Sequence, residues 1–185
     1  MKQILEGVKH IHSKRIIHRD IKPANIMMHS PLNSQRVVLF IADFGYVKLQ
    51  TCISANLISA AGTSVYMAPE LLLGDEQQLK EADSKIDIWS VGILLYQMTS
   101  HKFPFRSPTQ NVIQKFMEKY SQTGILDRPN SIKDDILWDL IEKMLAFDRH
   151  DRISAIDALN HPFFTGEQAK AEITDDPKDS WTCQS

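Results

Sequence analysis

Two polar segments of the chain carry residue types whose spacing could support phosphoryl-transfer chemistry. The first is the loop His18-Arg19-Asp20-Ile21-Lys22-Pro23-Ala24-Asn25, and the second is Asp43-Phe44-Gly45. Asn25 and Asp43 offer the oxygen ligands that Mg²⁺ prefers. Asp20 could orient an attacking hydroxyl group and accept its proton, and Lys22 could pair with a phosphate as a point charge. Such positioning and charge neutralisation are what transfer of a phosphoryl group from a nucleotide needs.

Each of these residues taken singly has a simpler explanation. Asp20 or Asp43 alone would more often be a turn residue, Asn25 a polar group at a turn or strand edge, and Lys22 a solvated charge. The order and spacing of the whole set favour the chemical interpretation, because a coincidence at every position is negligible. Gly45 supports it further, since glycine lets the backbone turn sharply after the metal ligand.

The elements that must position these segments are predicted from hydrophobic periodicity. Residues 1–13 carry apolar side chains at helical spacing on one face. Short β-type runs follow at 16–17, 26–28 and 37–42, and a polar turn separates the last two. Residues 49–63 are small and polar, with little periodicity, and predict a loop. The first polar segment therefore lies between two short strands, and the second follows a third strand.

The second half of the chain is predicted to be helical. Residues 86–98 are apolar on every face, which indicates a buried helix. Apolar stripes at 112–120 and 136–145 predict two more helices. We expect one domain over residues 1–164 and a polar, disordered tail over residues 165–185.

Three serines have the spacing of capping boxes at predicted helix starts. Ser84, Ser131 and Ser154 are each followed three residues later by an aspartate. The last of them opens a short helix near Ser154. For the first pair this makes Asp87 a candidate capping acid.

Composition bounds the functions that need considering. The 185 residues include 21 Lys+Arg and 23 Asp+Glu, with a net charge of −2, and 43% are hydrophobic. This balance gives no electrostatic reason to expect binding of nucleic acid or an anionic membrane. The longest apolar stretch is too short to span a bilayer, and no secretory signal is evident. Cys52 and Cys183 fit no metal spacing and predict reduced thiols in the cytoplasm or nucleus.

Several further motifs accompany the two polar segments. They are Gly62-Thr63 before Ala68-Pro69-Glu70, then Asp87-Ile88-Trp89-Ser90, Arg152-Ile153-Ser154-Ala155 and His161-Pro162-Phe163-Phe164. With them, residues 1–164 resemble the C-terminal lobe of a eukaryotic Ser/Thr protein kinase. The resemblance implies an α+β, protein-kinase-like fold, mainly helical, with a few short β-strands near the catalytic loop and no N-terminal lobe. It also implies ATP and Mg²⁺ as cofactors and Ser/Thr hydroxyls of proteins as substrates.

The resemblance assigns roles to individual positions. Asp20, Lys22 and Thr63 are implied as catalytic residues, with Thr63 bonding to the catalytic aspartate and lysine. Lys22, Asn25 and Asp43 are implied as cofactor-binding residues, and the last two as the metal ligands.

Other positions are implied as structural support. His18 is a packed core residue and not a base, and Asp87 holds the backbone of the catalytic loop; its alternative role as a capping acid stays open. Glu70 and Arg152 form a buried ion pair that anchors the activation segment. Arg19 implies control by phosphorylation of that segment through an arginine–phosphate pair, by an upstream activating kinase.

Candidate phosphorylation sites lie in the activation segment between Asp43 and Glu70. Ser54 and Ser59 are the first candidates and Thr51 is the next, although an ordinary loop hydroxyl is the simpler explanation of each.

Further positions bear on the subfamily and on substrate preference. The segments at residues 12–18 and 103–119 resemble the autophagy-initiating Ser/Thr kinases. Ala24 and Gln97 stand where arginine-directed kinases often carry acids, and Met67 stands where proline-directed kinases usually carry arginine.

The sequence contains neither a Gly-rich phosphate loop nor the strand lysine of the family's N-terminal lobe. We therefore expect these residues alone to bind ATP poorly and to transfer little phosphate. Three interpretations remain: part of an active kinase, a non-catalytic binding module or pseudokinase, and a lobe completed by a partner chain. The oligomeric state is not indicated.

Overall fold

The computed structural model describes residues 1–32, 36–46, 48–49, 64–73 and 83–172. Its helices are α1 Lys2–Ser13, α2 Pro69–Leu72, α4 Lys85–Ser100, α5 Gln110–Thr123, α6 Asp135–Met144, α7 Ala155–Leu159, α8 Pro162–Thr165 and α9 Glu167–Glu172. The described residues also form three 3₁₀ turns, η1 Pro23–Asn25, η2 Phe44–Tyr46 and η3 Ser64–Tyr66. The predicted α+β, mainly helical class is confirmed.

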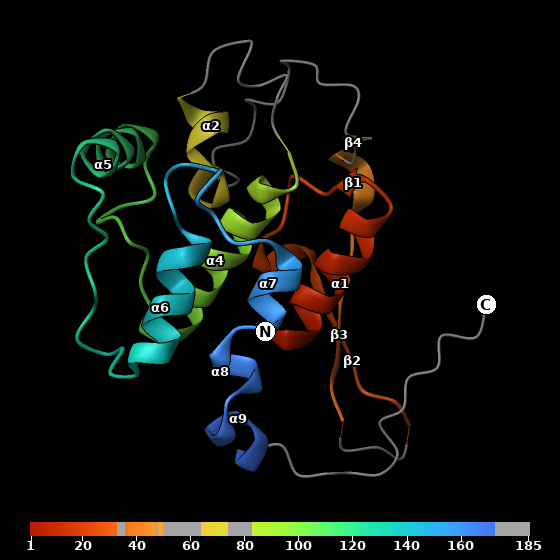
Figure 1. Cartoon of the computed structure of the whole chain (residues 1–185). Helices are drawn as coiled ribbons and strands as arrows, with labels where there is room; N and C mark the ends of the chain where they lie inside the picture. The colour runs from red at the N-terminus through yellow and green to blue at the C-terminus, as the bar shows by residue number, and fades with distance from the viewer. Residues whose placement is uncertain (33–35, 47, 50–63, 74–82, 173–185) are drawn as a thin grey trace.

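Helix α4 is the centre of the core. Every residue from 86 to 96 is buried, as its uniformly apolar sequence predicts. Figure 1 shows α4 in the middle of the molecule, with α6 on one side and α1 on the other. A Cβ on Gly92 would lie 2.8 Å from Leu145 Cδ2 and 3.0 Å from Met144 Cβ, so glycine is what allows α4 to lie close to α6 and the residue after it.

Two small antiparallel sheets frame the polar segments. Strand β2 Ile26–His29 pairs with β3 Val38–Ile41, with Ile26 opposite Ile41. Strand β1 Ile16–Ile17 pairs with β4 Lys48–Leu49. These pairings place the loop at residues 18–25 beside the turn that follows β3.

Helix α1 packs against β3 and closes its outer edge. The apolar stripe predicted for this helix is buried, with Leu5 and Val8 fully inaccessible. Gln3 then bonds the backbone of the strand and of the residue before it: its Oε1 accepts from Leu39 N at 2.6 Å and its Nε2 donates to Val37 O at 3.2 Å.

The helix starts only partly follow the predicted capping boxes. Ser154 caps α7, because its hydroxyl accepts from Asp157 N at 3.1 Å. Helix α6 is capped by Asp134 itself, which accepts from Ile136 N and Leu137 N, and not by Ser131.

The capping box predicted at Ser84 is wrong. The Ser84 side chain makes no cap bond, and Lys85 N donates instead to Asp83 Oδ1 at 2.7 Å. The reason is that the Asp87 carboxylate is directed into the core, toward the loop at residues 18–25.

Helical structure extends beyond the predicted domain boundary. Helix α9 occupies residues 167–172, inside the segment predicted as a tail. The remainder of that segment, residues 173–185, lies outside the described residues. Among the described residues, no helix has the length and apolar character that crossing a membrane requires.

Candidate active site

The loop at residues 18–25 brings three predicted site residues into direct contact. Asp20 Oδ2 accepts from Lys22 Nζ at 2.7 Å and from Asn25 Nδ2 at 2.9 Å. The same Asn25 amide group also donates to the Asp20 backbone oxygen at 2.7 Å. The turn η1 closes the loop, with Asn25 N donating to Lys22 O. Asp20 and Asn25 are both buried.

One oxygen of Asp20 has no hydrogen-bond partner among the described residues. Oδ1 is buried, and within the described part of the chain it accepts no hydrogen bond. An orphaned buried acceptor costs free energy, so its retention favours a role in binding a donor that arrives from outside. Because Lys22 and Asn25 hold the other oxygen, the side chain is fixed with Oδ1 as its available acceptor.

Asp43 joins this loop through the backbone. Ala42 N donates to Asn25 O at 2.8 Å, which ties the two candidate metal ligands to adjacent backbone positions. Asp43 has a φ of 61°, a left-handed conformation that aspartate tolerates better than most residues. The sharp backbone turn that the sequence predicts at Gly45 is therefore made at Asp43.

Gly45 has a different reason to be glycine. Its N–H donates to Asp43 Oδ1 at 3.2 Å, and a Cβ on Gly45 would lie 3.0 Å from the same oxygen. Glycine thus lets the backbone approach the carboxylate closely enough to orient it.

The donor set fits Mg²⁺. Both hydrogen bonds of Asn25 to Asp20 use its Nδ2, which leaves its Oδ1 as a ligand atom. Asp43 is exposed, so its carboxylate can be reached by a metal–nucleotide complex. An amide oxygen and a carboxylate leave the remaining positions of an octahedral ion to water and phosphate oxygens, as Mg²⁺ prefers. No cluster of three or more histidine, cysteine or acidic side chains occurs among the described residues.

His18 joins the two segments from inside the core. Its Nδ1 accepts from Asp20 N at 3.3 Å and its Nε2 donates to Ala42 O at 3.1 Å. The ring also makes an edge contact with Phe44, with centroids 5.1 Å apart. With both nitrogens bonded to the backbone and the side chain fully buried, His18 is placed to position the loop and not to move protons.

Asp87 of α4 holds the backbone of the same loop. Its Oδ2 accepts from His18 N at 2.9 Å and its Oδ1 accepts from Arg19 N at 2.8 Å. A third donor, His12 Nε2, lies 2.8 Å from Oδ2. The sequence analysis missed His12; the available signal was its place four residues after the buried Val8, on a face where a polar side chain needs a partner.

Arg19 is a buried cation, and some of its guanidinium donors make no hydrogen bond to a described residue. Its Nε and Nη2 are buried and make no hydrogen bond within the part of the chain that the structure describes. Burial lowers the pKa of the guanidinium, and the nearby Asp87 carboxylate opposes that shift. Its backbone φ is 67°, a left-handed conformation that is uncommon for a long side chain.

Glu70 and Arg152 form a two-pronged ion pair. Arg152 Nη1 donates to Glu70 Oε1 at 2.7 Å and Nη2 donates to Oε2 at 3.0 Å. The guanidinium also donates to backbone oxygens of Lys85, Ala146 and Phe147 and lies 5.1 Å from the Trp89 ring centroid. The pair fixes α2 to the core.

The predicted sites Thr63, Ser54, Ser59 and Thr51 lie outside the described residues.

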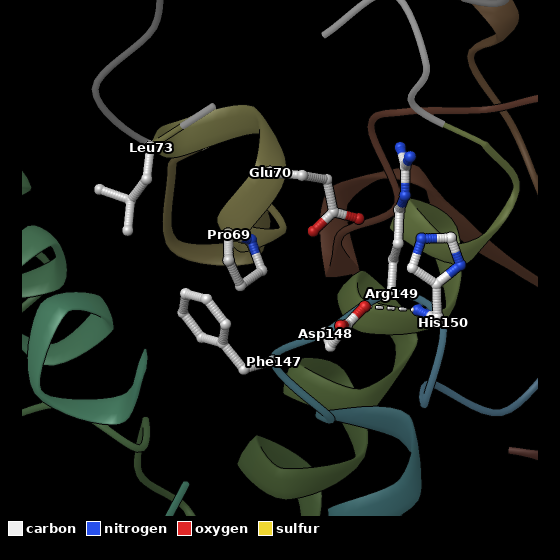
Figure 2. A pocket seen from close by; sticks show the side chains of 7 residues that line it. All are labelled: Pro69, Glu70, Leu73, Phe147, Asp148, Arg149 and His150. Atoms are coloured by element: carbon white, nitrogen blue, oxygen red, sulfur yellow. Dashed lines mark hydrogen bonds between the residues drawn. The ribbon is translucent and has the colours of Figure 1, made fainter. Parts of the chain in front are cut away.

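A surface pocket of about 360 Å³ lies beside this pair. Figure 2 shows Pro69, Leu73 and Phe147 on one side of it and Glu70, Arg149 and His150 on the other. None of the residues that line it belongs to the loop at residues 18–25 or to the turn at Asp43, so the pocket is separate from the candidate active site.

Comparison with known proteins identifies the family. Residues 1–164 match the family described as "Protein kinase domain". The chain is 36% identical over 167 residues to serine/threonine-protein kinase cds1 of Schizosaccharomyces pombe, covering 89% of this chain and 35% of cds1. It is 35% identical over 176 residues to calcium-dependent protein kinase 4 of Plasmodium falciparum, covering 95% of this chain and 32% of that kinase.

A third relative is serine/threonine-protein kinase unc-51 of Caenorhabditis elegans. The identity is 33% over 172 residues, covering 88% of this chain and 19% of unc-51. This chain thus spans about a third or less of the length of these curated relatives. The resemblance predicted from the motifs is confirmed: the chain belongs to the protein kinase family, alongside serine/threonine kinases.

Proposed function

We propose that this chain supplies the catalytic loop and metal ligands of a Ser/Thr protein kinase, which transfers the γ-phosphate of ATP to hydroxyl groups of protein substrates. The observation that carries the proposal is the state of Asp20. One of its oxygens is fixed by Lys22 and Asn25, while the other is buried and accepts no hydrogen bond from any residue that the structure describes. That arrangement suits an acceptor for a substrate hydroxyl.

The proposed reaction assigns each group a part. The substrate hydroxyl oxygen attacks the γ-phosphorus, the bond from that phosphorus to the bridging oxygen breaks, and ADP leaves with the electron pair. The hydroxyl proton is accepted at Asp20 Oδ1. Lys22 adds a positive charge near the transferred group. Mg²⁺ held by Asn25 and Asp43 would neutralise phosphate oxygens.

Regulation at Arg19 is part of the same proposal. Its Nε and Nη2, which make no hydrogen bond to a described residue, suit an anion, and a phosphate on the activation segment would supply one. Ser54 and Ser59 remain the candidate sites, with an upstream kinase as the source of the phosphate. Thr63 and membership of the autophagy-initiating group also remain predictions.

A second candidate function is a non-catalytic binding module. The observation that favours it is the apolar surface formed by strands β2 and β3 and by the residue before β3. Met28 is 75% exposed, and Met27, Val37 and Phe40 are about half exposed. A surface of this kind indicates a covering partner or segment. In a kinase, the N-terminal lobe would provide it.

The test compares two proteins: the 185-residue chain alone, and the same chain fused behind the N-terminal lobe of unc-51. Radiolabelled ATP, Mg²⁺ and a mixture of casein and histones report phosphoryl transfer. We expect little transfer by the chain alone, and Mg²⁺-dependent labelling of serine and threonine by the fusion. Asp20→Asn and Asp43→Asn should each abolish that labelling. A folded fusion no more active than these two variants would overturn the catalytic proposal and favour the binding module.

A further inference from the structure

The pocket beside the Glu70–Arg152 pair lies between two segments that are distant in sequence. One side comes from α2 and the residue after it, and the other comes from residues 147–150, in the connection between α6 and α7. Its volume of about 360 Å³ is near the lower end of the roughly 300–1,000 Å³ that small-ligand sites occupy. A space of this size accommodates one long side chain or a molecule of similar size.

One wall of the pocket is apolar. Pro69, Leu73 and Phe147 lie together on one side of it in Figure 2. Leu73 is 39% exposed and Phe147 is only partly buried, so both present apolar surface to solvent. Covering such surface with hydrocarbon is favourable. An occupant should therefore carry an apolar stem.

The opposite wall presents carboxylates. Figure 2 shows those of Glu70 and Asp148 on either side of the pocket's centre. Both oxygens of Glu70 already accept from Arg152, which balances that charge. Asp148 is exposed, its Oδ1 accepts from His150 N at 2.8 Å, and it forms no ion pair with a described residue. Asp148 thus supplies the charge that an occupant can meet.

The basic residue that lines the pocket does not take this place. Arg149 follows Asp148, but Figure 2 shows its side chain extending past Glu70, with the guanidinium away from the Asp148 carboxylate. The centre of the pocket is therefore bordered by an apolar wall and by carboxylates. This combination is complementary to a cation at the end of a hydrocarbon stem.

We infer that this pocket receives an arginine side chain of a partner protein, with its stem against the apolar wall and its guanidinium facing Asp148. Arginine fits better than lysine, because a guanidinium is more weakly hydrated than an ammonium group and packs against aromatic rings such as that of Phe147. The bound segment would contact α2 and residues 147–150 together, the same two parts of the molecule that the Glu70–Arg152 pair joins. The inference does not depend on phosphoryl transfer.

The test is a nuclear magnetic resonance titration of the 185-residue chain at neutral pH. The probe is the blocked peptide acetyl-Gly-Leu-Arg-Leu-Gly-amide, and its control has citrulline, the neutral isostere, in place of arginine. We expect the arginine peptide to shift the amide signals of residues 69–73 and 147–150 and to bind about 2- to 5-fold more tightly than the citrulline peptide, as a solvent-accessible ion pair allows. Free arginine should bind more weakly than the peptide.

Matched variants separate the two walls. Asp148→Asn keeps an oxygen for His150 N but removes the charge, so it should abolish the advantage of arginine over citrulline. The exposed Asp151→Asn should leave that advantage unchanged. Leu73→Ser should weaken the binding of both peptides equally, because it alters only the apolar wall.

The inference fails if the two peptides bind equally well, if the shifted signals lie elsewhere, or if Asp148→Asn has no effect. Free arginine binding as tightly as the peptide would overturn the assignment to a protein partner. So would signals of residues 69–73 that shift with protein concentration alone, with dimers in sedimentation, because the occupant would then be a second copy of this chain.

Discussion

The side-chain amide of Asn25 donates both of its short hydrogen bonds to one residue, Asp20, at 2.7 Å to the backbone oxygen and 2.9 Å to Oδ2. One side chain therefore fixes the backbone and the carboxylate of the candidate base together. Because both bonds are donated by Nδ2, the Asn25 amide oxygen takes no part in them.

Replacing this amide by a carboxylate should destabilise the fold in a pH-dependent way. Asn25→Asp removes two donors and sets a second negative charge against buried Asp20, so we expect a loss of about 1–3 kcal/mol at pH 7. Repulsion raises the folded-state pKa of one member of the pair above its unfolded value, so the penalty shrinks as the pH falls toward 4. Urea unfolding at both pH values measures this. The exposed Asn111→Asp is the control, and an equal penalty at both pH values would contradict the charge argument.

The pair between Glu70 and Arg152 should be costly to break from one side. Glu70→Gln leaves the guanidinium of Arg152, which is 1% exposed, without its charge partner. We expect a loss of about 3–5 kcal/mol in the free energy of unfolding. Glu167→Gln breaks an exposed pair with Lys170 and should cost less than about 1 kcal/mol. Similar losses for the two variants in urea unfolding would contradict this, because they would show that burial does not determine how much an ion pair contributes to stability.

Asp139 should contribute stability that disappears in acid. A hydrogen bond from Lys143, and a smaller one from His161, lower the pKa of Asp139. A depressed folded-state pKa means that the contribution is present above the unfolded value of about 3.9 and is lost as the pH falls through the folded value. Because the side chain is half exposed, solvent screening holds the effect below about 1 kcal/mol.

The matching experiment compares Asp139→Asn with wild type between pH 7 and pH 2. The stability difference between them should be largest at neutral pH and should narrow in acid. Asp151→Asn, at an exposed position near the start of α7, serves as the control and should differ little from wild type throughout. A stability difference between wild type and Asp139→Asn that grows in acid would contradict the lowered pKa of Asp139.

Gly92 should resist substitution although alanine is the better helix former. A Cβ there would lie 2.8 Å from Leu145 Cδ2, well inside normal contact distance. We expect Gly92→Ala to lose about 1–3 kcal/mol through overpacking, more than alanine gains in helix propensity. In a double-mutant cycle, Leu145→Ala should relieve part of this loss; strictly additive effects in thermal unfolding would rule out the steric cause.

Much of the fold could be predicted because its signals are local. The uniformly apolar run that forms α4, the short strands beside the loop, and the Ser154 cap all depend on residues close together in sequence. The kinase motifs likewise placed Asp20, Lys22 and Asn25 in one loop, where the structure finds them in contact.

The errors arose where distant residues compete for one group. Ser84 and Asp87 match a capping box by spacing, but the backbone donors of His18 and Arg19 lie 69 and 68 positions away and take the carboxylate. His12 was missed for the same reason, since its partner is 75 positions distant. At Asp43 and Gly45, the motif indicated a sharp turn but could not show which residue would carry the positive φ.

The contact between Gln3 and β3 has a consequence for how this chain meets other chains. A two-stranded sheet presents backbone groups along its free edges, and these can recruit a strand from another molecule. The amide proton of Leu39 in β3 and the carbonyl of Val37, the residue before the strand, are already bonded to the Gln3 side chain. The Gln3 side chain thus takes the hydrogen bonds that a neighbouring strand would make. A strand from another molecule would have to displace Gln3, and helix α1 that carries it, before the sheet could be extended.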